Sequence, residues 1–198
     1  MTDAKRKIAV FDFDGTLTTK DTLMEFIRYC HGSVRLYLGL LLFSPIILLM
    51  FFGLYNNGSA KEKLLSWFFK GMSYSEFSQL GMSFAERESE ILSRGIHAIL
   101  QQHLAEGADV YVVTASVEEW VRPFCLTLGV KEVIGTRMEV DGDGRLTGRF
   151  STPNCHGGEK VRRFLMVEPE RDSYTLHAYG DSSGDLEMFA FADFSRKV

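Results

Sequence analysis

The sequence predicts an α/β fold, in which an open, parallel Rossmann-like sheet carries an inserted all-helical cap domain. Three observations lead to this prediction. An uncharged apolar run at residues 8–11 is followed by two acidic residues and a glycine. A long stretch with helical spacing and no strand pattern follows. From residue 95 onward, short apolar strands alternate with amphipathic helices, which is typical of a parallel sheet with helices on both faces. We expect the core to comprise residues 1–17 and 93–198, and the cap residues 18–92.

The first strand is predicted at residues 8–11, because Ile-Ala-Val-Phe is typical of a strand buried on both faces. Asp12 and Asp14 follow on one side of the pleat, and Gly15 allows the backbone to turn sharply. Two buried carboxylates are costly unless they bind a partner. A hard cation such as Mg²⁺, which often shares its oxygen ligands with a phosphate, is such a partner. The alternative is a loop with two solvated acids.

The cap is expected to consist of helices. The first begins at Asp21 or Thr22, either of which is a suitable N-cap, and ends at Gly32-Ser33. Residues 61–70 and 77–92 have apolar side chains at helical spacing and predict two further amphipathic helices.

Between these helices, residues 36–60 contain no charged residue. The stretch is long enough for a transmembrane helix, but a single crossing would separate Asp12 from Thr114. We expect two apolar helices broken near Ser44-Pro45, because proline interrupts helices. One face should pack on the cap near the site, while the other is exposed or covered by a second subunit or a bilayer. Insertion of a helical hairpin into one leaflet, or contact with a membrane surface, is the alternative. An unbroken helix through Pro45 would argue against membrane contact.

The remainder of the chain predicts the sheet and its helices. A hairpin is expected at residues 137–150, where Asp141-Gly142-Asp143-Gly144 forms the turn. This turn lacks the later Glu of a calcium-binding EF-hand loop, so an ordinary hairpin is favoured. Strands are expected at 110–113, 132–134, 174–179 and 193–198, and helices at 96–105, 117–128, 159–167 and 186–191.

Polar residues follow the carboxyl ends of three predicted strands. These residues are Asp14, Thr114 and Asp181. In open α/β sheets the ligand crevice lies at that edge. Each residue also has an ordinary interpretation: Thr114 as a helix N-cap, Asp181 as part of a turn. Lys160 likewise fits a solvated first-turn position. Their joint order and spacing favour a common site.

Four stretches carry polar residues near the predicted strand ends: residues 11–17, residues 112–116, Lys160 within 155–160, and residues 179–185. Together they resemble the motifs of the haloacid dehalogenase (HAD) superfamily of phosphohydrolases, in that family's order. A helical cap between the first and second motifs resembles the phosphoserine phosphatase-like branch.

The resemblance implies a Mg²⁺-dependent phosphomonoester hydrolase that forms an aspartyl-phosphate intermediate. Asp12 is implied as the nucleophile, and Asp14 as the general acid and then the base. Asp14 also implies a phosphatase or phosphomutase, since dehalogenases lack this acid and transport ATPases carry Thr there. The implied catalytic residues are Asp12, Asp14, Thr114 and Lys160; the substrate-binding residues are Thr114, Ala115, Lys160 and Asp21. The implied metal ligands are Asp12, Asp14 through its backbone carbonyl, Asp181 and Asp185, the last either directly or through a neighbour.

The substrate is not fixed by the resemblance. Phosphoserine phosphatases usually carry Ser, Glu, Ser-Gly-Gly and Asn where this chain has Gly15, Asp21, residues 114–116 and Gly184. The apolar residues 36–55 are similar to those of bacterial phosphatidylglycerophosphate phosphatases. A membrane-associated lipid phosphate phosphatase is therefore the alternative, followed by a phosphomutase or an inactive binding protein on the same fold.

The composition of the chain argues against several classes of partner and binding site. The net charge of −4 argues against nucleic acid. Cys30, Cys125 and Cys155 form no Cys-Xaa-Xaa-Cys pair, which argues against disulfides and a zinc site. Residues 1–7 are short and charged, unlike a signal peptide. We expect a cytoplasmic protein with a small phosphorylated substrate; the alternative is peripheral membrane contact or a homodimer through the apolar cap segment.

Overall fold

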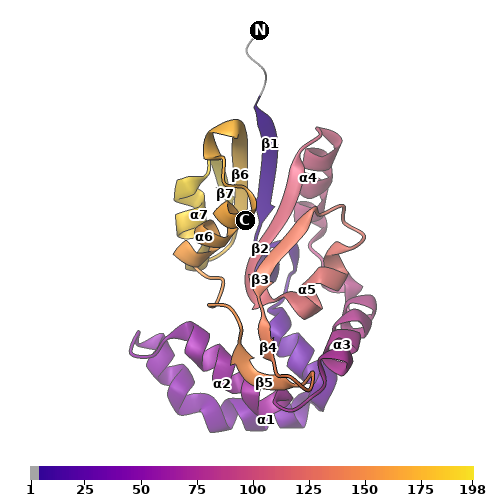
Figure 1. The fold of residues 1–198 in the computed structure, drawn as a ribbon, viewed down its shortest axis with the longest axis vertical. Helices are drawn as coiled ribbons and strands as arrows, with labels where there is room; N and C mark the ends of the chain where they lie inside the picture. The colour runs from indigo at the N-terminus through magenta and orange to yellow at the C-terminus, as the bar shows by residue number, and fades with distance from the viewer. Residues whose placement is uncertain (1–4) are drawn as a thin grey trace.

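The computed structural model describes residues 5–198 and is built around a five-stranded sheet with the order β3-β2-β1-β6-β7 (Figure 1). All neighbouring strands in this sheet pair in parallel. This confirms the predicted open parallel sheet. The strands are β1 (Arg6–Phe11), β2 (Asp109–Val117), β3 (Glu132–Thr136), β6 (Tyr174–Gly180) and β7 (Phe194–Lys197).

Helices cover both faces of the sheet. Helices α4 (Arg94–Ala105) and α5 (Glu118–Cys125) lie on one side, and α6 (Gly158–Val167) and α7 (Leu186–Phe191) on the other (Figure 1). Successive side chains of β1 enter different hydrophobic clusters: Phe11 packs in one and Val10 in the other. Strand β1 is therefore buried on both faces, as predicted from its sequence.

Three helices lie at one end of the sheet: α1 (Thr22–Phe51), α2 (Asn57–Phe69) and α3 (Tyr74–Arg87). A short 3-10 helix, Ser89–Ile91, leads back to α4. Aromatic rings hold this end together. The Phe26 ring stacks on Phe69 at 5.5 Å and on Trp120 of α5 at 4.8 Å, centroid to centroid. The helical segment is thus packed against the sheet-flanking helix α5.

The predicted break at Ser44-Pro45 is wrong, because α1 runs through Pro45 as a helix. Proline cannot donate a hydrogen bond to the carbonyl four residues earlier, which here is Leu41 O. The Ser44 hydroxyl donates to Leu41 O at 2.8 Å and replaces that bond. The helix is interrupted instead at Gly32, where φ is 77°, close to the predicted end at Gly32-Ser33. The hairpin that we envisaged inside one leaflet does not form, so the structure argues against that membrane interpretation.

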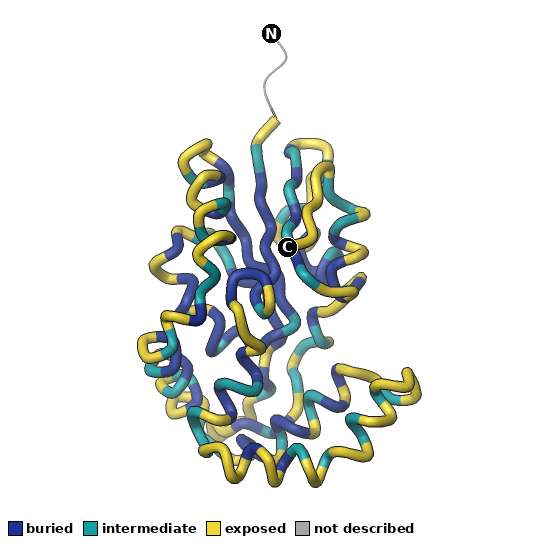
Figure 2. Tube along the Cα trace, turned by 180° about the vertical axis from the view of Figure 1, so that it is seen from behind, coloured by how far each residue is buried: buried dark blue, intermediate teal, exposed yellow. Residues whose placement is uncertain are grey.

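After Gly32, the outer face of α1 is exposed. Leu41 is 71 % exposed and Leu48 is 58 % exposed, whereas Leu36 is buried. The helical end of the molecule is mostly exposed or intermediate in Figure 2. This confirms that one apolar face of this segment packs on a neighbouring helix while the other face is open. Within residues 5–198, α1 is also long and apolar enough to cross a membrane by length and composition.

The predicted hairpin forms from β4 (Met138–Val140) and β5 (Leu146–Phe150), which pair in antiparallel fashion. It lies beside α2 rather than in the main sheet (Figure 1). Leu146 N donates to Met72 O at 2.9 Å, and a Cβ on Gly148 would lie 3.0 Å from Ser66 Cβ. The hairpin therefore links the sheet to the helical end.

Candidate active site

The carboxyl ends of β1, β2 and β6 open into one pocket. Phe11 at the end of β1 is in register with Val112 of β2 and Tyr179 of β6. The residues that follow these three positions therefore meet at the same edge. They line a pocket of about 450 Å³ that includes Asp12, Asp14, Thr114, Ala115 and Asp181.

Asp12 and Lys160 form a buried ion pair in this pocket. The two side chains are 2.8 Å apart, from Lys160 Nζ to Asp12 Oδ1. Burial raises the pKa of Asp12 to about 6, although the Lys160 ammonium acts in the opposite direction. Burial also lowers the pKa of Lys160, but Asp12 and Asp185 outweigh it and raise that pKa above its ordinary value. Lys160 is thus a charged, buried residue rather than a solvated one.

Asp185 also contacts Lys160. Its Oδ1 lies 2.5 Å from Lys160 Nζ. Its Oδ2 accepts hydrogen bonds from the backbone N–H and the hydroxyl of Ser182, at 3.1 and 3.0 Å. With both oxygens engaged, Asp185 fixes the position of Lys160 and the turn after β6.

Three carboxylates gather at the base of the pocket. One oxygen each from Asp12, Asp181 and Asp185 lies within 4.8 Å of the others. A Cβ on Gly15 would lie 2.8 Å from Asp181 Cγ, so only glycine leaves room for this carboxylate. An all-oxygen, acidic set of this kind fits a hard divalent cation such as Mg²⁺.

The Asp14 side chain turns toward the start of α1. Its Oδ1 accepts from the backbone N–H and the hydroxyl of Thr22, at 2.7 and 2.6 Å. Its Oδ2 accepts from the Ser116 hydroxyl. Thr22 is itself fixed, because Trp120 Nε1 donates to its hydroxyl at 3.1 Å. Helix α1 thus holds Asp14 in place through its first residue, and a helix N-terminus also favours a nearby carboxylate.

Thr114 and Ala115 lie within β2, since the strand continues to Val117. Thr114 is therefore not the N-cap of the next helix. Its Oγ1 accepts from Ser116 N at 3.1 Å. Asp21, at the edge of the same pocket, caps α1 by accepting from Leu23 N at 2.9 Å.

Lys61, a residue that sequence reasoning missed, also reaches the pocket. It belongs to α2, and its ammonium donates to Ala115 O at 3.0 Å. Within residues 5–198, no carboxylate oxygen lies within 4.0 Å of that ammonium. Burial lowers the pKa of Lys61, while Asp14 and Asp21 act in the opposite direction. It is the first charge after the uncharged stretch 36–60, but only the placement of α2 brings it to the site.

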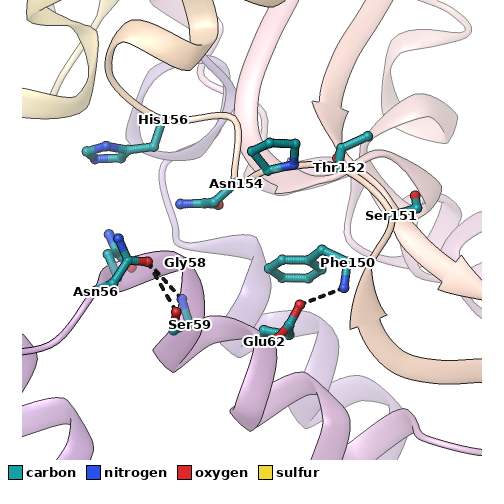
Figure 3. Close-up of a pocket in the computed structure, with 11 residues that line it drawn as sticks. Asn56, Gly58, Ser59, Glu62, Phe150, Ser151, Thr152, Asn154 and His156 are labelled. Atoms are coloured by element: carbon teal, nitrogen blue, oxygen red, sulfur yellow. Dashed lines mark hydrogen bonds between the residues drawn. The ribbon is translucent and has the colours of Figure 1, made fainter.

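A polar recess of about 600 Å³ adjoins the pocket and shares Asn57 and His156 with it. In Figure 3, Asn154 and His156 lie on the chain segment opposite the start of α2. Asn56 caps α2 by accepting from Ser59 N at 3.0 Å. A Cβ on Gly58 would lie 2.8 Å from Asn154 Cβ, so the helix start approaches this segment closely.

Comparison with known proteins places this geometry in context. A family model described as haloacid dehalogenase-like hydrolase matches residues 9–190. Protein CicA of Caulobacter vibrioides is 37 % identical over 187 residues, which cover 94 % of this chain and 83 % of that protein. Phosphoserine phosphatase SerB1 of Mycobacterium tuberculosis is 28 % identical over 189 residues, covering 92 % of this chain and 61 % of that one. A substrate-bound phosphoserine phosphatase structure shares the fold, with a TM-score of 0.65 and 20 % identity over 98 % of this chain and 86 % of that one.

Proposed function

Because the chain belongs to the haloacid dehalogenase-like hydrolase family, we propose that it is a Mg²⁺-dependent phosphomonoester hydrolase that forms an aspartyl-phosphate. The observation that carries this proposal is the buried Asp12–Lys160 pair at the carboxyl edge of a parallel sheet, with Asp14 in the same pocket. The likeness to a protein named as a phosphatase supports the same reaction class.

Asp12 is the nucleophile. One of its oxygens attacks phosphorus, the bond from phosphorus to the leaving oxygen breaks, and Asp14 gives that oxygen a proton. Asp14 then takes a proton from water, whose oxygen attacks the phosphorus of the aspartyl-phosphate. Phosphate leaves and the Asp12 carboxylate is restored. The hydrogen bonds from Thr22 and Ser116 hold Asp14 in place for both proton transfers.

The cationic and polar side chains hold the phosphoryl oxygens. Lys61 of α2 lines the pocket, and Lys160 of α6 contacts Asp12, which also lines it. Thr114 and the backbone at Ala115 add hydrogen-bonding groups. Such fixed charges and dipoles stabilise the charge that develops on the phosphoryl group.

Mg²⁺ would be held by Asp12, Asp181 and the backbone carbonyl of Asp14. Asp185 would lie next to these ligands, where it contacts Lys160. When bound, the ion offsets the repulsion between these carboxylates and the phosphate.

We propose the same division of the chain as above: a core of residues 1–17 and 93–198 and a cap of 18–92, with the β4–β5 hairpin packed on the cap. We also propose a cytoplasmic location and a small phosphorylated substrate.

The test is hydrolysis of a panel of phosphomonoesters by the purified chain with Mg²⁺, compared with Asp12→Asn. The variant should unfold within a few degrees of the wild type, because Asn fills the same space, and should lose at least about 10³-fold in kcat, as loss of a covalent nucleophile does. Activity of Asp12→Asn within tenfold of the wild type would overturn the proposal.

A further inference from the structure

An apolar groove runs away from the catalytic pocket between α1 and α2. It has a volume of about 420 Å³, within the range of ligand sites. Its walls include Leu40, Phe43 and Ile47 of α1 and Leu64 of α2. These side chains come from the stretch of α1 beyond the Gly32 kink and from the facing side of α2.

The groove adjoins the catalytic pocket. Asp21, Asn57 and Lys61 line both of them. These three are also the polar residues of the groove; the rest of its lining is apolar. A ligand that spans the junction would therefore meet charge at one end and hydrocarbon along the other.

The position of Lys61 orients such a ligand. Its ammonium lines the pocket but contacts no carboxylate among residues 5–198, so a phosphoryl group bound there would be its direct charge partner. The apolar walls begin on the same helix, with Ala60 and Leu64 adjacent to Lys61 in the lining. The charged pocket and the apolar groove therefore follow one another in the same order as the phosphate group and the hydrocarbon chain of such a ligand.

From this geometry we propose that the substrate is a phosphomonoester with an aliphatic chain, and that the α1–α2 groove binds that chain. The inference rests on the proposed phosphatase function and adds its substrate class. It also accounts for the apolar side chains of α1 that face the groove without full burial. Phe43 and Ile47 are both of intermediate exposure, which leaves surface for a chain to cover.

The direct test measures the binding of n-alkyl phosphonates, from ethyl to decyl, to the wild-type protein with Mg²⁺ by calorimetry. Phosphonates are not hydrolysed, so their Kd reports the groove even without turnover. All ligands are kept below their micellar concentration. Each added methylene should lower Kd about fourfold until the groove is filled, which corresponds to about 0.8 kcal/mol per buried CH₂. A Kd that is independent of chain length would overturn the inference.

Two variants test whether the dependence of Kd on chain length arises in the groove. In Ile47→Asp, the ratio of the ethyl to the decyl Kd should fall at least tenfold, because a carboxylate would stand in the groove. Leu48→Asp is the matched control: Leu48 is 58 % exposed, does not line the groove, and should keep the wild-type ratio. Equal loss in both variants would contradict the placement. If sedimentation shows a dimer that Ile47→Asp dissociates, with no effect of chain length, a second copy covers the groove and the inference fails.

Parallel kinetics with ethyl and decyl phosphate separate this inference from the proposed function. Hydrolysis of both esters with equal kcat/KM would support the proposed phosphatase function and contradict the proposal that the groove binds an aliphatic chain. A Kd that depends on chain length, without hydrolysis of any ester, would support binding of an aliphatic chain in the groove and contradict the proposed phosphatase function.

Discussion

Replacing Lys61 by Met should lower the activity of the protein without lowering its stability. Lys61 is a partly buried cation that lines the pocket and makes one hydrogen bond, to Ala115 O at 3.0 Å. Methionine keeps most of the side-chain length and removes the charge. Loss of one fixed donor to a developing oxyanion typically costs about 10²–10³-fold, or about 3–4 kcal/mol, so we expect kcat/KM for a small phosphomonoester to fall by that factor.

The stability of the protein should not fall with activity. Burial lowers the pKa of Lys61, so the charged form opposes folding at all pH values below the ordinary lysine pKa. Removing the charge should leave the free energy of unfolding unchanged or raise it by about 1 kcal/mol, since Ala115 O keeps its bond from Thr136 Oγ1. The assays are steady-state kinetics and urea unfolding at pH 7. Lys63→Met, which alters an exposed lysine of the same helix, is the control. An activity within threefold of wild type, or destabilisation by more than 1 kcal/mol, would refute this reasoning.

Two further predictions concern metal and pH. Chelation should abolish turnover and Mg²⁺ should restore it, whereas Ca²⁺ should suppress it because Ca²⁺ prefers more ligands at longer distances; full activity after exhaustive chelation would count against the acidic cluster as a metal site. Burial raises the pKa of Glu119 to about 7, and its Oε2 has no hydrogen-bond partner among residues 5–198. The folded protein thus holds this proton more tightly than the unfolded chain, and its stability falls as pH rises from the unfolded pKa to the folded one. Glu119→Gln should raise the free energy of unfolding by about 2 kcal/mol at pH 8 and by little at pH 4, and an equal change at both pH values would contradict this cause.

The sheet and the edge that carries the candidate site could be predicted from the sequence. Residues 8–11 have a pattern typical of a strand buried on both faces, and Asp12, Asp14 and Gly15 come directly after it. Because parallel strands align their carboxyl ends, Thr114 and Asp181 could be placed beside them without coordinates. These features depend on local pattern and topology alone.

Other features depend on contacts that no local pattern reports. Lys61 reaches the site because α2 packs across the pocket, and Gly148 lies against Ser66 because the hairpin docks on α2. The Ser44 hydroxyl was a readable signal, since it precedes Pro45 and can bond Leu41 O in the proline's place. Treating proline alone as a helix break led to the wrong prediction for α1.

We propose that Asp12 carries the phosphoryl group during turnover. The most direct measurement is an acid quench of the wild-type enzyme with saturating substrate and Mg²⁺, followed by borohydride reduction and peptide mass spectrometry. Borohydride converts an aspartyl-phosphate into homoserine. We predict homoserine at position 12 only when substrate is present, and none in Asp12→Asn. Homoserine at position 14, or phosphate on another residue such as His156, would contradict the account.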